Sequence, residues 1–165
     1  MNSLLTNCKQ IVGVLAFLPF VIANTAIAQE QVMLTITNVS GNVIVELTEE
    51  ELFAMEQTSI FTENECVDGL VEFSGPLARD IIALLGDAEI EALKLTATND
   101  YSVKVPVSDI MEYDVIFAMM QDSVRFSARD KGPIWVIYPM TDHVELQDRI
   151  YNDRLIWQLV QVNAL

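Results

Sequence analysis

The chain has 165 residues, with 24 acidic and nine basic side chains, one histidine and a formal net charge of −15 at pH 7. Because so negative a protein repels nucleic acid and anionic lipid, the composition excludes a function that depends on binding either one. It favours an acidic, soluble protein towards which a partner with a basic patch would be steered.

The first 28 residues have the pattern of a cleaved export signal. A nearly continuous apolar run, Ile11 to Ile22, follows a region whose only charged side chain is Lys9, and Ala26-Ile-Ala28 supplies a cleavage site, so we expect a mature chain that begins near Gln29. A membrane anchor is the alternative, although the run is shorter than the roughly 18 to 20 residues of a membrane span. No pair of arginines precedes the run, which favours Sec-type export of an unfolded chain to the periplasm or the medium, without stable membrane insertion after cleavage.

Residues 29–165 are about the size of one domain with its own core. Apolar residues alternate with polar ones, or gather in β-branched and aromatic runs, in a series of short segments. We expect strands at 32–37, 42–47, 58–62, 69–73, 93–98, 101–105, 114–120, 124–126, 134–138 and 155–162. The segments on either side of Ser40-Gly41, and those on either side of Asn99-Asp100, predict hairpins.

Helical signals are confined to two or three short pieces. Thr48-Glu-Glu-Glu51 is a capping box that begins a helix reaching about Met55. Ser74-Gly-Pro76 predicts the start of a second helix, which Gly86 ends, and residues 106–111 predict a short turn or single helical turn. Residues 142–153 are polar and acidic and predict a surface excursion. The fold class is therefore α+β, mainly β, in a single domain.

The most concentrated positive charge lies in a turn before the apolar run 134–138. Arg129 and Lys131 flank Asp130, and Gly132-Pro133 leads into the strand. In so acidic a chain this turn is the best candidate for an anion site. The alternative is that both cations pair with nearby acids.

A second candidate lies at the tip of the hairpin 93–105. Asn99 and Asp100 are residues that form turns, and turn chemistry alone would explain them. They could instead line a pocket, where the Asp100 carboxylate would accept hydrogen bonds from a donor-rich heterocycle.

Other reactive side chains predict no catalytic set. Cys66, in the polar loop 63–68, is the only cysteine after residue 28, so an intramolecular disulfide is excluded in the mature chain; its thiol is buried and inert, reactive, or half of an intermolecular bridge. A single histidine, His143, does not predict zinc or haem ligation. The acids at 49–51 and Glu56 fit a solvated face, and no phosphate loop or serine elbow is present.

Five motifs, in this order, resemble the sulfite-oxidase-like molybdopterin-binding domain in its short exported bacterial form, over residues 32–162. They are Gly75-Pro-Leu77, Asn99-Asp-Tyr101, Ser127-Ala-Arg-Asp-Lys-Gly-Pro133, Tyr138-Pro139 and Ile156-Trp-Gln158. The resemblance implies a mixed, mainly β fold with a pterin pocket between loops. In that family a loop cysteine ligates molybdenum, and basic and polar side chains hold the pterin and its phosphate.

The resemblance implies two functions and leaves a third open. Short proteins of this kind look like periplasmic pterin-binding regulators, without molybdenum, that report to a membrane-bound sensor enzyme of cyclic-di-GMP signalling. The alternative is a small molybdenum-cofactor oxidoreductase with Cys66 as the metal ligand, although Val67-Asp68-Gly69 follows Cys66 where that family has Ala-Gly-Asn-Arg. A ligand-free interaction domain is the third.

In the pterin-binding interpretation, amide and carboxylate groups bind the amino-pyrimidine edge, an aromatic ring stacks on the heterocycle, and cations hold a polar or anionic tail. The residues expected at the pocket are Asn99, Asp100, Tyr101, Arg129, Lys131, Trp135 and Tyr138.

Overall fold

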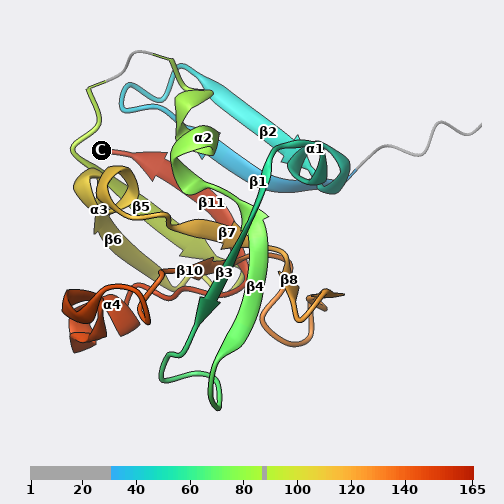
Figure 1. The fold of residues 1–165 in the computed structure, drawn as a ribbon. Coiled ribbons are helices and arrows are strands. Elements are labelled where there is room, and N and C mark those ends of the chain that lie inside the picture. The colour runs from blue at the N-terminus through green and yellow to red at the C-terminus, as the bar shows by residue number, and fades with distance from the viewer. Residues whose placement is uncertain (1–30, 87–88) are drawn as a thin grey trace, which may run out of the picture.

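The computed structural model describes residues 31–86 and 89–165 (Figure 1). The expected leader, residues 1–28, and its cleavage site lie outside the described residues. Within the described ranges, no helix has both the length and the apolar character needed to cross a bilayer.

One sheet has five strands in the order β2-β1-β11-β5-β6. Its strands are β1 (Val32–Thr37), β2 (Ile44–Thr48), β5 (Ala92–Ala97), β6 (Ser102–Pro106) and β11 (Leu159–Ala164). The two predicted hairpins are confirmed as the antiparallel pairs β1–β2 and β5–β6. Since β1 and β11 are parallel, the sheet is mixed.

The described residues form two further sheets, a four-stranded one in the order β3-β4-β8-β9 and a two-stranded one formed by β10 and β7. Their strands are β3 (Gln57–Thr62), β4 (Val71–Pro76), β7 (Ile116–Ala118), β8 (Met120–Gln121), β9 (Val124–Arg125) and β10 (Trp135–Ile137). Figure 1 shows β3 and β4 as a long antiparallel pair whose connecting loop lies at the lower edge of the view.

The helices are short. They are α1 (Glu49–Ala54), α2 (Ala78–Ala83), α3 (Val107–Glu112), the 3-10 helix η1 (Val144–Gln147) and α4 (Arg149–Asn152). The predicted capping box is confirmed, because Glu51 N donates to Thr48 Oγ1 over 3.3 Å and Thr48 N donates to Glu51 Oε2 over 2.9 Å. The α+β, mainly β class is also confirmed.

The expected start of the second helix is wrong. Ser74-Gly-Pro76 belongs to β4, where Ser74 pairs with Ser59 of β3 and with Met120 of β8, and α2 begins only after Leu77. A Cβ on Gly75 would lie 2.1 Å from the carbonyl oxygen of Phe117, so glycine lets β4 cross close to β7. Pairing on both sides of the strand therefore overrides the local helix-start signal.

Two other predicted strands are shorter than expected. Residues 114–120 divide into β7 and β8, because Ala118 pairs with Trp135 of β10 whereas Met120 pairs with Ser74 of β4. The last strand begins at Leu159, because Gln158 has a φ of 53° that interrupts extended backbone.

The core has two parts. The larger cluster joins Leu34 and Leu95 of the five-stranded sheet to Ile81 of α2 and Ile110 of α3, all of them buried. The smaller one lies between the β3–β4 pair and the β7–β10 pair, where the rings of Phe73 and Trp135 meet edge to face with centroids 5.2 Å apart. These clusters hold the loops that form the candidate site.

Candidate functional site

A pocket of about 330 Å³ brings together several of the predicted residues. The hairpin turn after β5 contributes Asn99 and Tyr101, and the loop after β3 contributes Cys66. The opposite wall is formed by the end of α4 and the segment that leads to β11, with the lining residues Asn152, Asp153, Leu155, Ile156 and Trp157. Its volume is at the lower end of the range of small-molecule sites, about 300 to 1,000 Å³.

Two aromatic side chains line this pocket and remain accessible. Tyr101 is 54% exposed and Trp157 is 43% exposed, although large aromatic residues usually bury most of their surface. The Trp157 ring also meets the buried Trp135 ring at a centroid distance of 6.3 Å, which anchors one side of it to the core. The pocket therefore offers two aromatic rings to a planar ligand.

The polar groups of the pocket differ from those expected. Asn99 Oδ1 accepts a hydrogen bond from Tyr101 N over 3.1 Å, so this oxygen stabilises the turn, as the simpler interpretation proposed. Asp100 is exposed at the tip with a φ of 65° and does not line the pocket. The carboxylate that does line it belongs to Asp153, at the C-terminal end of α4.

Cys66 and Lys131 are joined through the backbone. Lys131 Nζ donates to the Cys66 carbonyl oxygen over 3.1 Å and lies 4.3 Å from the centre of the Trp135 ring, so this cation holds the Cys66 loop against the core. Burial raises the pKa of the Cys66 thiol, an effect that the Lys131 charge partly opposes and Glu65 adds to. The thiol is therefore protonated at neutral pH and a weak nucleophile.

Three other predicted residues lie outside the pocket. Arg129 is exposed, and no ion pair joins it to an acid in the part of the chain that the structure describes. Trp135 and Tyr138 are fully buried, so the interpretation of both as stacking groups is corrected. They are core residues whose polar atoms are satisfied internally, Trp135 by the Leu155 carbonyl over 3.1 Å and Tyr138 by the Asp109 carboxylate over 3.1 Å.

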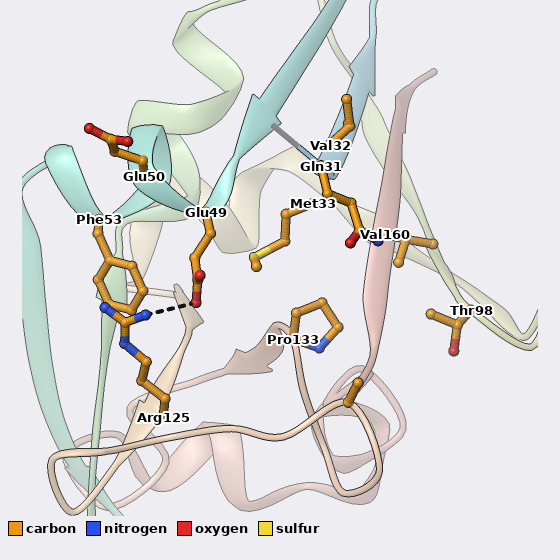
Figure 2. A pocket seen from close by; sticks show the side chains of 11 residues that line it. Gln31, Val32, Met33, Glu49, Glu50, Phe53, Thr98, Arg125, Pro133 and Val160 are labelled. Atoms are coloured by element: carbon orange, nitrogen blue, oxygen red, sulfur yellow. Dashed lines mark hydrogen bonds and ion pairs between the residues drawn. The ribbon is translucent and has the colours of Figure 1, made fainter. Parts of the chain in front are cut away.

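A larger groove of about 690 Å³ lies nearby (Figure 2). Thr98 lines the groove, whereas the next residue, Asn99, lines the pocket. On one wall the Arg125 guanidinium lies 4.3 Å from the centre of the Phe53 ring and donates to Glu49 Oε1 over 3.1 Å. Arg125 is thus already paired with an acid, and Arg129 and Lys131, the cations of the anion site expected from the sequence, do not line this groove.

The side chains of the pocket do not fit a phosphate-bearing molybdenum cofactor. In the part of the chain that the structure describes, no lysine or arginine lines the pocket, and the Asp153 carboxylate would repel a phosphate. Among the described residues, no group of three or more histidine, cysteine, aspartate or glutamate side chains could hold a metal ion. The polar lining groups are one protonated thiol, two amides, one hydroxyl, one indole N–H and one carboxylate. Because Asn99 Oδ1 and Asn152 Oδ1 already accept backbone N–H groups, the Asp153 carboxylate is the main acceptor left for a neutral ligand that donates hydrogen bonds.

Comparison with known proteins bears on the fold. The structure is similar to the sulfane dehydrogenase SoxCD from Paracoccus pantotrophus, with a TM-score of 0.60 and 13% sequence identity, and the match covers 79% of this chain and 37% of that chain. The chain thus spans little more than a third of the length of the dehydrogenase chain. No protein-family model and no curated protein matches the sequence. At 13% identity this likeness shows the fold alone.

Six of the nine lining residues were not among those predicted, and they include the acidic residue Asp153 and the exposed aromatic residue Trp157. Trp157 does lie in the Ile156-Trp-Gln158 motif, which was a usable signal, but the apolar run around it predicts a strand. Asp153 lies in the polar and acidic segment 142–153, where no feature of the sequence distinguishes it from the neighbouring acidic residues.

Proposed function

We propose that this chain is a binding module for a neutral pterin, held without molybdenum. The observation that carries the proposal is the presence of two accessible aromatic rings, Tyr101 and Trp157, in one pocket with a carboxylate, Asp153. A pterin ring is planar and aromatic, so it can stack on Tyr101 or Trp157. Its amino-pyrimidine edge presents adjacent N–H donors, for which the Asp153 carboxylate is the matching acceptor.

The biological role that we propose is signalling. The resemblance of the sequence to short periplasmic regulators favours a periplasmic protein whose ligand state is reported to the membrane-bound sensor of a cyclic-di-GMP enzyme. The acidic surface, with 24 acidic residues in the chain, suits a partner with a basic docking surface. Ligand binding and signalling can be tested separately, and the pocket supports only the proposal of ligand binding.

The test of ligand identity begins with protein purified from its native compartment. Released pterin is measured by fluorescence and molybdenum by elemental analysis. Pterin without molybdenum supports the proposal. About one molybdenum per chain would instead favour a small oxidoreductase with Cys66 as ligand, and the absence of both would favour a ligand-free interaction domain.

The test of the site uses a pair of matched variants. Asp153→Asn removes the carboxylate of the pocket and should weaken pterin binding about tenfold or more, because hydrogen bonds to charged groups are worth about 1.5 to 3 kcal/mol. Asp100→Asn makes the same charge change outside the pocket and should leave the dissociation constant unchanged. If Asp100→Asn weakened pterin binding and Asp153→Asn did not, Asp100 would be the residue that binds the pterin. Cys66→Ser should leave pterin binding intact, whereas loss of binding would support a role for the thiol.

A further inference from the structure

The two larger sheets have four edge strands, and three of them are protected against pairing with another chain. Charged residues, prolines, irregular register and short length are the usual protections of an exposed edge. β2 carries Glu46 and pairs with β1 in a register that shifts, and β6 carries Lys104 and ends at Pro106. β9 has only two residues, one of which is Arg125.

The fourth edge strand, β3, has none of these protections. Its six residues, Gln57–Thr62, include no charged residue, proline or glycine, and they pair with β4 in unbroken register. In the described part of the chain no strand pairs with its other side. At its C-terminal end the strand is joined to Thr141, whose N donates to Thr62 Oγ1 over 3.3 Å and whose Oγ1 accepts from Glu63 N over 2.9 Å. The side chain of Phe61 is 55% exposed.

A groove of about 270 Å³ runs along this free edge. Four consecutive residues of β3, 58–61, form one wall, and Asp114, Pro139, Asp142 and His143 form the other. Asp114 is paired with Arg79 at 2.6 Å, whereas Asp142 is exposed and no lysine or arginine within the described ranges pairs with it. The groove therefore combines unpaired strand backbone with a carboxylate.

We infer that the free edge of β3 is a docking site for an extended segment of a protein partner, which adds to the four-stranded sheet as a further strand and places a lysine or arginine opposite Asp142. In strand addition the backbone hydrogen bonds supply affinity and alternate side chains supply specificity. The exposed Phe61 offers an apolar contact to the added strand, and the acidic character of the groove and of the whole chain selects a basic segment. The inference does not depend on pterin binding, because no residue of this edge lines the pterin pocket.

The experiment uses the purified protein and two labelled peptides that share an alternating valine and threonine centre. One peptide has lysines at both ends and the other has glutamates. Binding is measured by fluorescence anisotropy, and hydrogen exchange reports whether residues 57–61 gain protection. We expect the lysine peptide to bind and to protect these residues, and the glutamate peptide not to bind.

Matched variants locate the site. Phe61→Lys and Ile44→Lys introduce the same charge at exposed positions of different edge strands, since Ile44 of β2 is 60% exposed. Phe61→Lys should weaken binding of the lysine peptide roughly tenfold, and Ile44→Lys should leave it unchanged. Asp142→Asn should weaken binding of the lysine peptide and make that binding less dependent on salt concentration, whereas Glu46→Gln should change neither property.

Three results would overturn the inference. In the first, Phe61→Lys binds the lysine peptide as the unaltered chain does. In the second, the glutamate peptide binds equally well. In the third, no peptide binds but sedimentation shows a dimer that Phe61→Lys abolishes, in which case the edge belongs to a second copy of this chain. Pterin binding is measured on every variant and should stay constant, so failure of this inference and failure of the pterin proposal are distinguishable.

Discussion

The ion pair between Arg154 and Asp109 makes the sharpest prediction about stability. Arg154 follows α4 and Asp109 lies in α3, and their side chains are only 12% and 8% exposed. The guanidinium donates to Asp109 Oδ2, the oxygen that also accepts the Tyr138 hydroxyl over 3.1 Å. We therefore expect Arg154→Met, which keeps the apolar stem and removes the charge, to leave an uncompensated buried carboxylate.

The size of the effect follows from this geometry. Removal of one partner of a buried ion pair costs about 3 to 5 kcal/mol. Asp109 keeps the hydrogen bond from Tyr138, so we expect the lower end, about 3 kcal/mol, out of a total stability of about 5 to 15 kcal/mol for an ordinary domain. Because Asn152 at the end of α4 and the C-cap residue Asp153 line the pocket, loss of the ion pair next to them should also weaken pterin binding.

The assay is urea unfolding followed by tryptophan fluorescence, for which the buried Trp135 is the natural reporter. The control is the double variant Asp109→Asn/Arg154→Met, in which the asparagine can still accept from Tyr138 but carries no charge. It should recover most of the lost stability. A loss below about 1 kcal/mol in Arg154→Met, or a double variant as unstable as the single one, would refute the electrostatic reasoning.

Three further predictions concern other parts of the fold. Burial raises the pKa of Tyr138 above its ordinary value of about 10, so the neutral side chain stabilises the native state below that pH, and this stabilisation is lost as the pH rises above it. The urea concentration at the unfolding midpoint should therefore fall from pH 8 to pH 10 and pH 11. It should fall less in Tyr138→Phe, which has no hydroxyl to ionise. Gly75→Ala should destabilise by more than about 3 kcal/mol or prevent folding, because its Cβ would collide with the Phe117 carbonyl, and a melting curve close to that of the unaltered chain would contradict this. Thr48→Ala should cost about 1 kcal/mol by removing the cap to Glu51, whereas an unchanged urea midpoint would mean that packing alone holds α1.

Features set by neighbouring residues could be predicted from the sequence. The capping box at Thr48 and the turns at Ser40-Gly41 and Asn99-Asp100 act over four residues or fewer, and the structure has all of them. The same reasoning failed at residues 74–76. The proline there is placed as at the start of a helix, but β4 pairs with strands on both sides and lies close to β7, and these long-range contacts set its extended conformation.

The site was predicted only in part, for a related reason. Asn99, Tyr101 and Cys66 were recognisable as polar or aromatic residues on loops, and they do meet at one pocket. Trp135 and Tyr138 belong to a run buried on both faces, so their aromatic character serves the core. Asp153 is a pocket residue because long-range contacts position the end of α4, among them the Arg154–Asp109 ion pair and the hydrogen bond from Glu65 N to Asn152 Oδ1, and no local sequence pattern predicts such contacts.

The position of β11 has a consequence for the order in which the chain can fold. This strand lies between β1 and β5, so the strand synthesised after all the others occupies the middle of the five-stranded sheet. While translation proceeds, β1–β2 and β5–β6 can form only as separate hairpins, and two-stranded hairpins are marginally stable in water. The sheet closes when Leu159–Ala164 has emerged from the ribosome, and contacts over so long a separation form slowly.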